Sequence, residues 1–251
     1  MNIFLSIVYL IITFSITVFI YKVFGKEGTY VWICVSIIIA NIQSVKIVEI
    51  FGLTTTLGNV AYSNVFLATD ILNENEGSKS ANKSVLFGFI FMILFTCLMS
   101  LSLLFEASPL DTSQESLRNI FTIIPRICIA SLAGYLASQF LDVLLFKKLK
   151  QKYNKLWLSN NLSTIVSQLV DTIVFTLIAY SGLVPWIELL EIAGTMYALK
   201  VIIALADTGF IYLSRYLKNK EKNNKNNDKI EKKTNFYLNI LIIFKNILKL
   251  N

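Results

Sequence analysis

The sequence contains no histidine, and it is poor in charged residues and in cysteine. Only 16% of its 251 residues are charged and three are cysteines, whereas 55% are apolar. The lack of histidine excludes a catalytic triad, a metal site or a proton relay that depends on an imidazole. We find no glycine-rich phosphate-binding loop, so the chain is not expected to hydrolyse ATP by itself. We therefore expect neither an enzyme nor a cofactor.

The three cysteines do not indicate a disulfide framework or a metal motif. Cys34, Cys97 and Cys128 all fall in long apolar segments. An isolated thiol in such surroundings behaves as a small hydrophobic side chain. We expect these thiols to contribute to packing.

Long apolar segments occupy most of the chain. A soluble domain carries about a quarter charged residues, and roughly 20 apolar residues in a helix cross a hydrocarbon core of about 30 Å. Seven segments meet that length, namely 3–20, 30–48, 52–72, 84–105, 120–146, 162–184 and 189–213. The sequence therefore predicts an all-α fold, a polytopic membrane helical bundle of about seven transmembrane helices.

Loop charges predict the orientation, because Lys and Arg stay on the cytoplasmic side of short loops. The loop after the fifth segment carries Lys147, Lys148, Lys150, Lys152 and Lys155. The loops after the fourth and sixth segments are acidic. Seven spans then place the N-terminus outside and the C-terminus inside.

The net charge of +7 belongs to the end of the chain. Residues 215–251 hold ten Lys and Arg against three Asp and Glu, and residues 1–214 sum to zero. We predict a membrane transport domain at 1–214 and a basic, Lys/Asn-rich cytoplasmic tail at 215–251. The expected partner of the chain is the lipid bilayer, and we expect no direct binding of nucleic acid. Lys245 and Lys249 interrupt the apolar run at 236–250, which favours an interfacial helix over an eighth span.

The fifth and sixth segments share the motif Ser-Gln-x-x-Asp-x-x-x-Phe, which begins at Ser138 and recurs at Ser167. Its copies contain Gln139 with Asp142 and Gln168 with Asp171. At 100° per residue both helices have one polar face, and the short loop between them should bring these faces together. A carboxylate beside an amide offers donors and acceptors in one plane, which suits a flat heteroaromatic edge with adjacent N–H groups.

Other polar and aromatic residues in the apolar segments have two interpretations. Asp70 and Lys200 are ionisable groups that cost ~2.5–3.5 kcal/mol each at a helix centre, so they should face the interior. Each one by itself also suits a helix-locking ion pair. Tyr62, Phe66 and Tyr135 offer a stacking face, or pack between helices.

These residues resemble a known family. The stretches at 66–74, 126–146 and 157–172, together with Lys200, are similar to the queuosine precursor transporter family, also called the vitamin uptake transporter family, over roughly residues 31–213. The resemblance implies a multi-pass importer in the bacterial inner membrane that carries 7-cyano-7-deazaguanine, its aminomethyl analogue or queuine for tRNA modification by salvage.

The resemblance also implies which residues bind the solute or couple its transport. Together with Tyr135 from the polar stripe of the fifth segment, these are Asn41, Asp70, Arg126, Gln139, Asp142, Asn161, Gln168, Asp171 and Lys200. Our hypothesis is that one Asp accepts the guanine-like N1–H and 2-amino hydrogens while a Gln or Arg binds the carbonyl.

Two alternatives remain at this point. The chain could be the substrate-binding S subunit of an energy-coupling-factor importer, in which case an ATPase pair would be its partner. It could also be a membrane enzyme or an assembly factor, a class that turnover in detergent would reveal.

Overall fold

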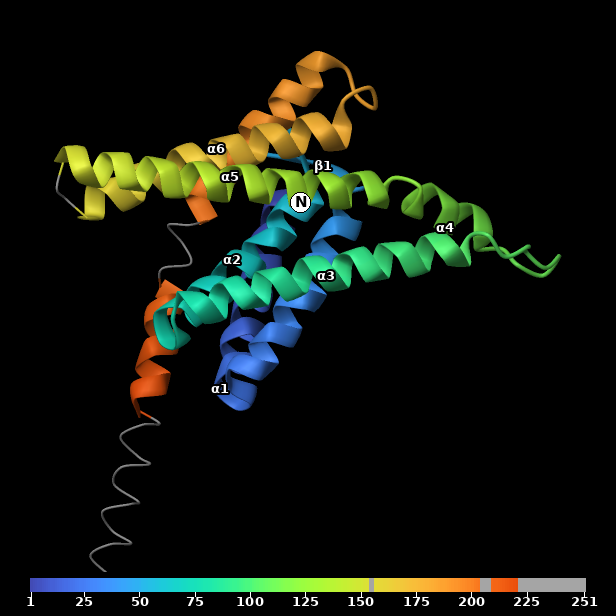
Figure 1. Cartoon of the computed structure of the whole chain (residues 1–251). Coiled ribbons are helices and arrows are strands. Elements are labelled where there is room, and N and C mark those ends of the chain that lie inside the picture. The colour runs from blue at the N-terminus through green and yellow to red at the C-terminus, as the bar shows by residue number, and fades with distance from the viewer. Residues whose placement is uncertain (154–155, 204–208, 221–251) are drawn as a thin grey trace, which may run out of the picture.

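The computed structural model describes residues 1–153, 156–203 and 209–220. The side chains of Asp142 and Asn161, both predicted site residues, lie outside that description, as does the predicted interfacial helix at 236–250. Within the described residues the chain forms helices and one two-stranded hairpin (Figure 1).

Helix α1 (Asn2–Gln43) contains the first two predicted spans in one element. Its 42 residues include Gly25 with φ 63° and ψ −151°, a left-handed conformation that glycine adopts at little cost. The two halves run back along each other, because Trp32 Nε1 donates to Thr17 Oγ1 at 2.8 Å and the Tyr9 hydroxyl donates to Gln43 at 3.3 Å. The sharp reversal at Gly25 thus separates two spans.

A β-hairpin follows α1, where the sequence predicted two helical spans separated by residues 49–51. Strands β1 (Ile47–Ile50) and β2 (Leu53–Thr56) pair antiparallel, with Ile47 opposite Thr56. The prediction that 30–48 and 52–72 are helical to their ends was wrong here. The β-branched residues of both strands favour a pleated backbone, and Phe51 (φ 55°) and Gly52 (φ 75°) form the tight turn between them.

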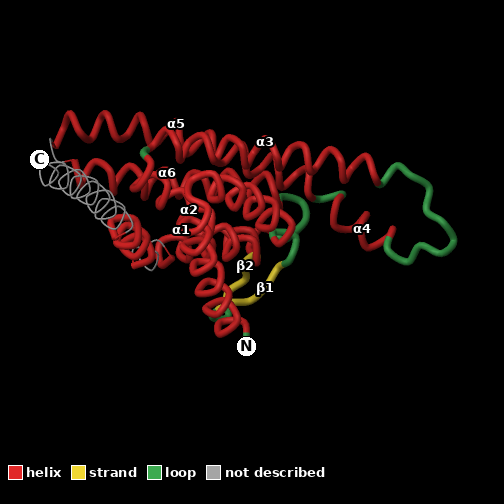
Figure 2. Tube along the Cα trace, turned by 90° about the horizontal axis from the view of Figure 1, so that it is seen from below, coloured by secondary structure: helices red, strands yellow, loops and turns green. Residues whose placement is uncertain are grey.

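The remaining elements are helices. They are α2 (Leu57–Glu76), α3 (Ser78–Ser102), α4 (Gln114–Phe121), α5 (Ile124–Tyr153), α6 (Leu156–Tyr180) and the helical segments 186–203 and 209–220. Figure 1 shows α5 and α6 lying side by side, and α3 crossing α1 and α2. The N-terminus lies close to the hairpin, as Figure 2 shows, and Asn2 Nδ2 donates to the Glu49 carbonyl oxygen at 2.9 Å.

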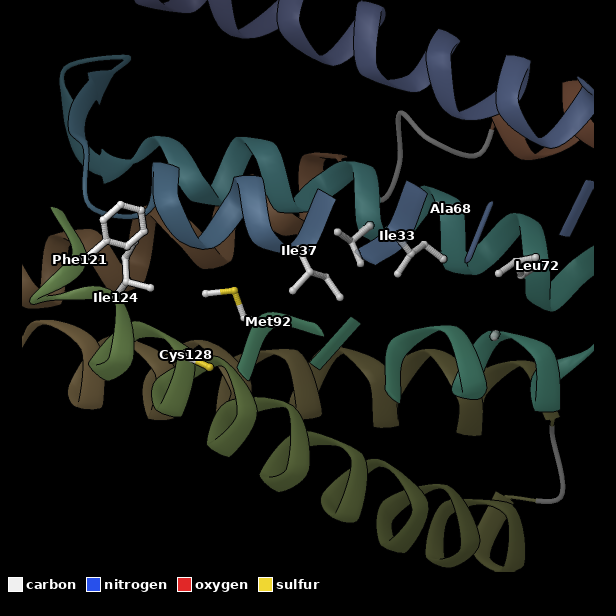
Figure 3. Close-up of a cluster of buried hydrophobic side chains, with 10 residues drawn as sticks. Ile33, Ile37, Ala68, Leu72, Met92, Phe121, Ile124 and Cys128 are labelled. Atoms are coloured by element: carbon white, nitrogen blue, oxygen red, sulfur yellow. The ribbon is translucent and has the colours of Figure 1, made fainter. Parts of the chain in front are cut away.

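Apolar packing joins the group formed by α1, α2 and α3 to the group formed by α5 and α6. Figure 3 shows Ile37 of α1, Met92 of α3 and Cys128 of α5 in one buried cluster, with Ala68 and Leu72 of α2. Burial of such side chains stabilises the contact by roughly 25 cal/mol per Å² of apolar surface. The cluster therefore fixes α2 and α5 relative to each other.

Several helices carry large exposed apolar side chains on their outer faces. Phe4 of α1, Phe91 of α3 and Phe140 of α5 are examples, and exposed apolar surface of this extent marks contact with lipid. In the described part of the chain, Asn2–Gln43, Ser78–Ser102 and Gln114–Leu141 are long and apolar enough to cross a membrane, and Ile165–Tyr180 is a shorter apolar helix. The prediction of an all-α, polytopic membrane bundle is confirmed.

Candidate functional site

A cavity of about 490 Å³ lies between the two groups of helices. One face of α2 forms much of its wall, and the lining residues recur every three or four positions: Gly58, Asn59, Tyr62, Val65, Phe66, Thr69, Asp70 and Asn73. Positions with this spacing share one helix face. From Gly58 to Asn73 the helix rises roughly 22 Å, so the cavity follows α2 through most of the bundle.

Helix α5 contributes the polar stripe that the sequence predicted. Ser131, Tyr135, Ser138 and Gln139 line the cavity. Ser131 Oγ donates to Asn41 Oδ1 at 2.8 Å, and Asn41 Nδ2 donates to the Ile37 carbonyl oxygen at 2.7 Å. Asn41 is therefore a buried link between α1 and α5 at the edge of the cavity.

Helix α6 and segment 186–203 place an ion pair in the cavity wall. Lys200 Nζ lies 2.5 Å from Asp171 Oδ2, and the side chains are 10% and 20% exposed, respectively. Lys200 also donates to Thr172 Oγ1 at 3.1 Å. One turn earlier on α6, the Gln168 amide oxygen is buried and has no hydrogen-bond partner among the described residues.

Gly134 allows α5 to approach the Asp171 carboxylate closely. A Cβ atom at this position would lie 2.9 Å from Asp171 Oδ1 and 3.0 Å from the Asp171 carbonyl oxygen. Such distances are shorter than van der Waals contact, so only glycine fits between α5 and α6 without a shift. The backbone of α5 therefore limits the positions that the carboxylate can take.

Aromatic rings also contribute to the cavity. The Tyr62 and Phe66 rings of α2 meet edge to face with centroids 5.3 Å apart. On the other side, Tyr135 packs against Phe89 of α3 at 5.0 Å. Tyr62, Phe66 and Tyr135 line the cavity, so flat apolar surfaces stand beside its polar groups.

Asp70 lies toward the C-terminal end of the α2 face. Asp70 is exposed and lines the cavity, and its side chain has no ion pair or hydrogen bond among the described residues. The described ionisable lining thus consists of two carboxylates, Asp70 and Asp171, and the Lys200 ammonium. The cavity wall carries an excess of one negative charge when all three are ionised.

The structure brings most of the predicted site residues together. Those lining the cavity are Asn41, Asp70, Tyr135, Gln139, Gln168, Asp171 and Lys200. Arg126 is placed elsewhere, because its guanidinium donates to the carbonyl oxygens of Ile178 and Ser181 at the end of α6. Arg126 thereby holds α5 against the end of α6.

Three further asparagines in the cavity wall were not among the predicted site residues. Asn59, Asn73 and Asn82 line it, and Asn59 Nδ2 donates to the Met196 carbonyl oxygen at 3.4 Å. The recurrence of Asn59, Asp70 and Asn73 on one face of α2 is the signal that could have found the first and last of these, whereas Asn82 lies on α3. No group of three metal-ligating side chains occurs among residues that the structure describes.

Comparisons with known proteins agree with this placement. Residues 56–214, which hold all the cavity-lining residues except Asn41 and Ser44, match the family model described as "Putative vitamin uptake transporter". The chain is similar to a "Probable queuosine precursor transporter" of Bacillus subtilis (strain 168), at 42% identity over 212 residues, covering 83% of this chain and 93% of the relative.

Two further relatives are more distant. A "Probable queuosine precursor transporter" of Haemophilus influenzae is 33% identical over 133 residues, covering 52% of this chain and 54% of the relative. A "Queuosine precursor transporter" of Escherichia coli (strain K12) is 30% identical over 161 residues, covering 63% of this chain and 71% of the relative. No solved structure gives a significant match.

Proposed function

Because the chain belongs to the vitamin uptake transporter family, we propose that it imports 7-deazaguanine precursors of queuosine across the bacterial inner membrane. The solute would be 7-cyano-7-deazaguanine, its aminomethyl analogue or queuine, salvaged for tRNA modification. The chain is a multi-pass bacterial membrane protein, and the printed names of its relatives supply the substrate class.

The cavity is the structural observation that supports this proposal. Its volume of about 490 Å³ lies within the roughly 300–1,000 Å³ of typical small-molecule sites. Amide, carboxylate and ammonium groups share the wall with aromatic rings, as a flat, polar heterocycle requires. The excess negative charge also tolerates the amine of the aminomethyl analogue.

Growth-coupled restoration of queuosine in tRNA tests the proposal. The host cannot synthesise the base and lacks its own importer, and each precursor is supplied at low concentration. We expect at least one precursor to restore queuosine, measured by mass spectrometry of tRNA digests. Asp171→Ala should abolish restoration at equal protein level, because it leaves the Lys200 ammonium unpaired in the bundle.

A matched control separates loss of function from loss of protein. Cys97 is exposed on α3 and absent from the cavity lining, so Cys97→Ser should restore queuosine like the unmodified chain. If no precursor works although both proteins reach the membrane, the proposed substrate is wrong.

We propose transport by the chain itself, without catalysis. Solute recovered after uptake by vesicles should be chemically unchanged. The alternative of an S subunit in an energy-coupling-factor importer predicts co-purification with an ATPase pair, and uptake by vesicles that contain only this chain would exclude it.

A further inference from the structure

The Asp171–Lys200 ion pair lies in the cavity wall, beside Thr172 and one helical turn from Gln168. The pair is mostly buried, and Lys200 Nζ reaches both Asp171 Oδ2 at 2.5 Å and Thr172 Oγ1 at 3.1 Å. Two opposite charges in an apolar bundle compensate each other, and removal of one leaves the other uncompensated at high cost. A solute can therefore open the pair only if it satisfies both groups.

Two acceptors next to the pair have no donor in the described part of the chain. Asp171 Oδ1 and the Gln168 amide oxygen have no hydrogen-bond partner among the described residues. The two residues are three positions apart on α6 and therefore share a face. A buried acceptor without a donor costs free energy, so a ligand that brings N–H groups gains by filling it.

We infer that Asp171 and Lys200 together select the guanine-type edge of the solute by exchanging their mutual ion pair for it. The inference rests on the proposed function. A guanine-type edge presents a carbonyl oxygen, a ring N–H and an amino group in a row. Asp171 accepts from the ring N–H and the amino group, and the released Lys200 ammonium donates to the carbonyl oxygen, so both charges stay hydrogen-bonded throughout.

The arrangement of donors decides which heterocycles can open the pair. A hypoxanthine-type edge lacks the amino group and offers Asp171 one donor in place of two. A xanthine-type edge turns a second carbonyl oxygen toward the carboxylate, which repels it. The Asp171 carboxylate thus acts as the filter, since an edge with fewer donors repays less of the cost of releasing Lys200.

The test measures the affinity ratio between two ligands on the full-length protein in detergent. The probes are 7-cyano-7-deazaguanine and its analogue without the 2-amino group, and isothermal titration calorimetry measures the affinity of each. We expect the unmodified protein to bind the first about tenfold or more tightly, because a lost hydrogen bond to a buried charge has that effect.

Two variants separate the roles of the pair. Asp171→Asn keeps the shape but turns one acceptor into a donor that faces the 2-amino group, so the ratio should fall to about one. Lys200→Met should change both affinities by the same factor and preserve the ratio, since both probes carry the carbonyl. A merely structural role for Asp171 would weaken both probes equally.

Controls keep the outcomes distinct. Glu74→Gln removes one carboxylate of the exposed pair with Arg215, 3.2 Å apart and outside the cavity, and should leave both affinities unchanged. If Asp171→Asn aggregates in size-exclusion chromatography, the uncharged double variant Asp171→Asn/Lys200→Met replaces it, again with a ratio near one. An unchanged ratio overturns the inference while the proposed function stands, and failure of the unmodified protein to bind either probe overturns both.

Discussion

At the residue scale, the position of a few atoms around Asp171 decides what the cavity can bind. Its carboxylate meets Lys200 on one side and the Gly134 backbone on the other. The sequence predicted that the polar faces of α5 and α6 meet and that Gln168 and Asp171 share one face, because helical periodicity places them together. Periodicity does not say which cation pairs with which carboxylate, since Lys200 is 29 residues from Asp171 along the chain.

Gly134→Ala tests the close approach of α5 and α6. The added Cβ would lie 2.9 Å from Asp171 Oδ1 and 3.0 Å from the carbonyl oxygen, and overpacking of this kind typically costs about 1–3 kcal/mol. We expect a lower melting temperature and weaker binding of the precursor, measured by thermal unfolding and titration in detergent.

Gly194→Ala is the matched control for this change. Gly194 is helical, and a Cβ there meets nothing within 4 Å. Alanine in a helix is about 1 kcal/mol more favourable than glycine, so this variant should be as stable as the unmodified protein or more so. Equal stability of the two variants would show that α5 and α6 have room to separate.

Arg126 lies outside the cavity lining, so its role in solute binding or coupling stays a prediction. The sequence offered it as a solute-site residue, but its guanidinium donates to two carbonyl oxygens at the end of α6. Those carbonyls have no partner within a helix that ends there. The need for such a cap depends on where α6 ends relative to α5, which only the folded chain reveals.

At the element scale, the hairpin between α1 and α2 is the main departure from the sequence prediction. An apolar, β-branched run fits a membrane helix and a buried strand equally well by composition. The tertiary contacts favour the hairpin, because the Thr54 amide donates to Glu191 at 2.5 Å and the Tyr180 hydroxyl donates to the Ser44 carbonyl oxygen at 2.9 Å. The hairpin thus contacts segment 186–203 directly, and the end of α6 holds Ser44, which lies between α1 and the hairpin.

The turn of the hairpin gives a test of this element. Gly52 has φ 75° and a Cβ there would meet nothing within 4 Å, so Gly52→Val acts only through backbone strain. Strain of this type costs about 1–3 kcal/mol. We expect a lower melting temperature, whereas Gly52→Asn, which tolerates a positive φ, should lose much less. Equal losses for Val and Asn would mean that the turn is not left-handed.

At the scale of the whole molecule, contacts between distant segments occur at two ends of the helical bundle. The N-terminus, the hairpin and Glu191 lie at one end. At the other end the Tyr21 hydroxyl and Lys218 Nζ donate to Glu76, each at 2.8 Å. Burial raises the pKa of Glu76, but these hydrogen bonds outweigh it and hold the pKa below its usual value.

This grouping agrees with the predicted orientation, which stays a prediction. The N-terminus and Glu191, which the prediction places outside, contact the hairpin, and Lys218, which it places inside, contacts Glu76. The helical segment 209–220 continues across the predicted boundary between 1–214 and 215–251, and that division also stays a prediction.

Cysteine labelling tests the orientation. The three native cysteines are replaced by alanine, and single cysteines are introduced as Phe51→Cys in the hairpin turn or Lys79→Cys at the start of α3, both exposed positions. A membrane-impermeant maleimide should label Phe51→Cys in intact cells and Lys79→Cys only after permeabilisation. The reverse pattern would mean that the N-terminus is inside.

The sequence by itself determined that this is a helical membrane protein with polar faces on the fifth and sixth apolar segments, because apolar length and helical periodicity are local properties. It also contained the motifs of the transporter family. Only the tertiary structure decided that Lys200 pairs with Asp171, that Arg126 supports the end of α6 and that residues 47–56 form a hairpin. These outcomes depend on contacts between segments far apart in the chain, which no local pattern encodes.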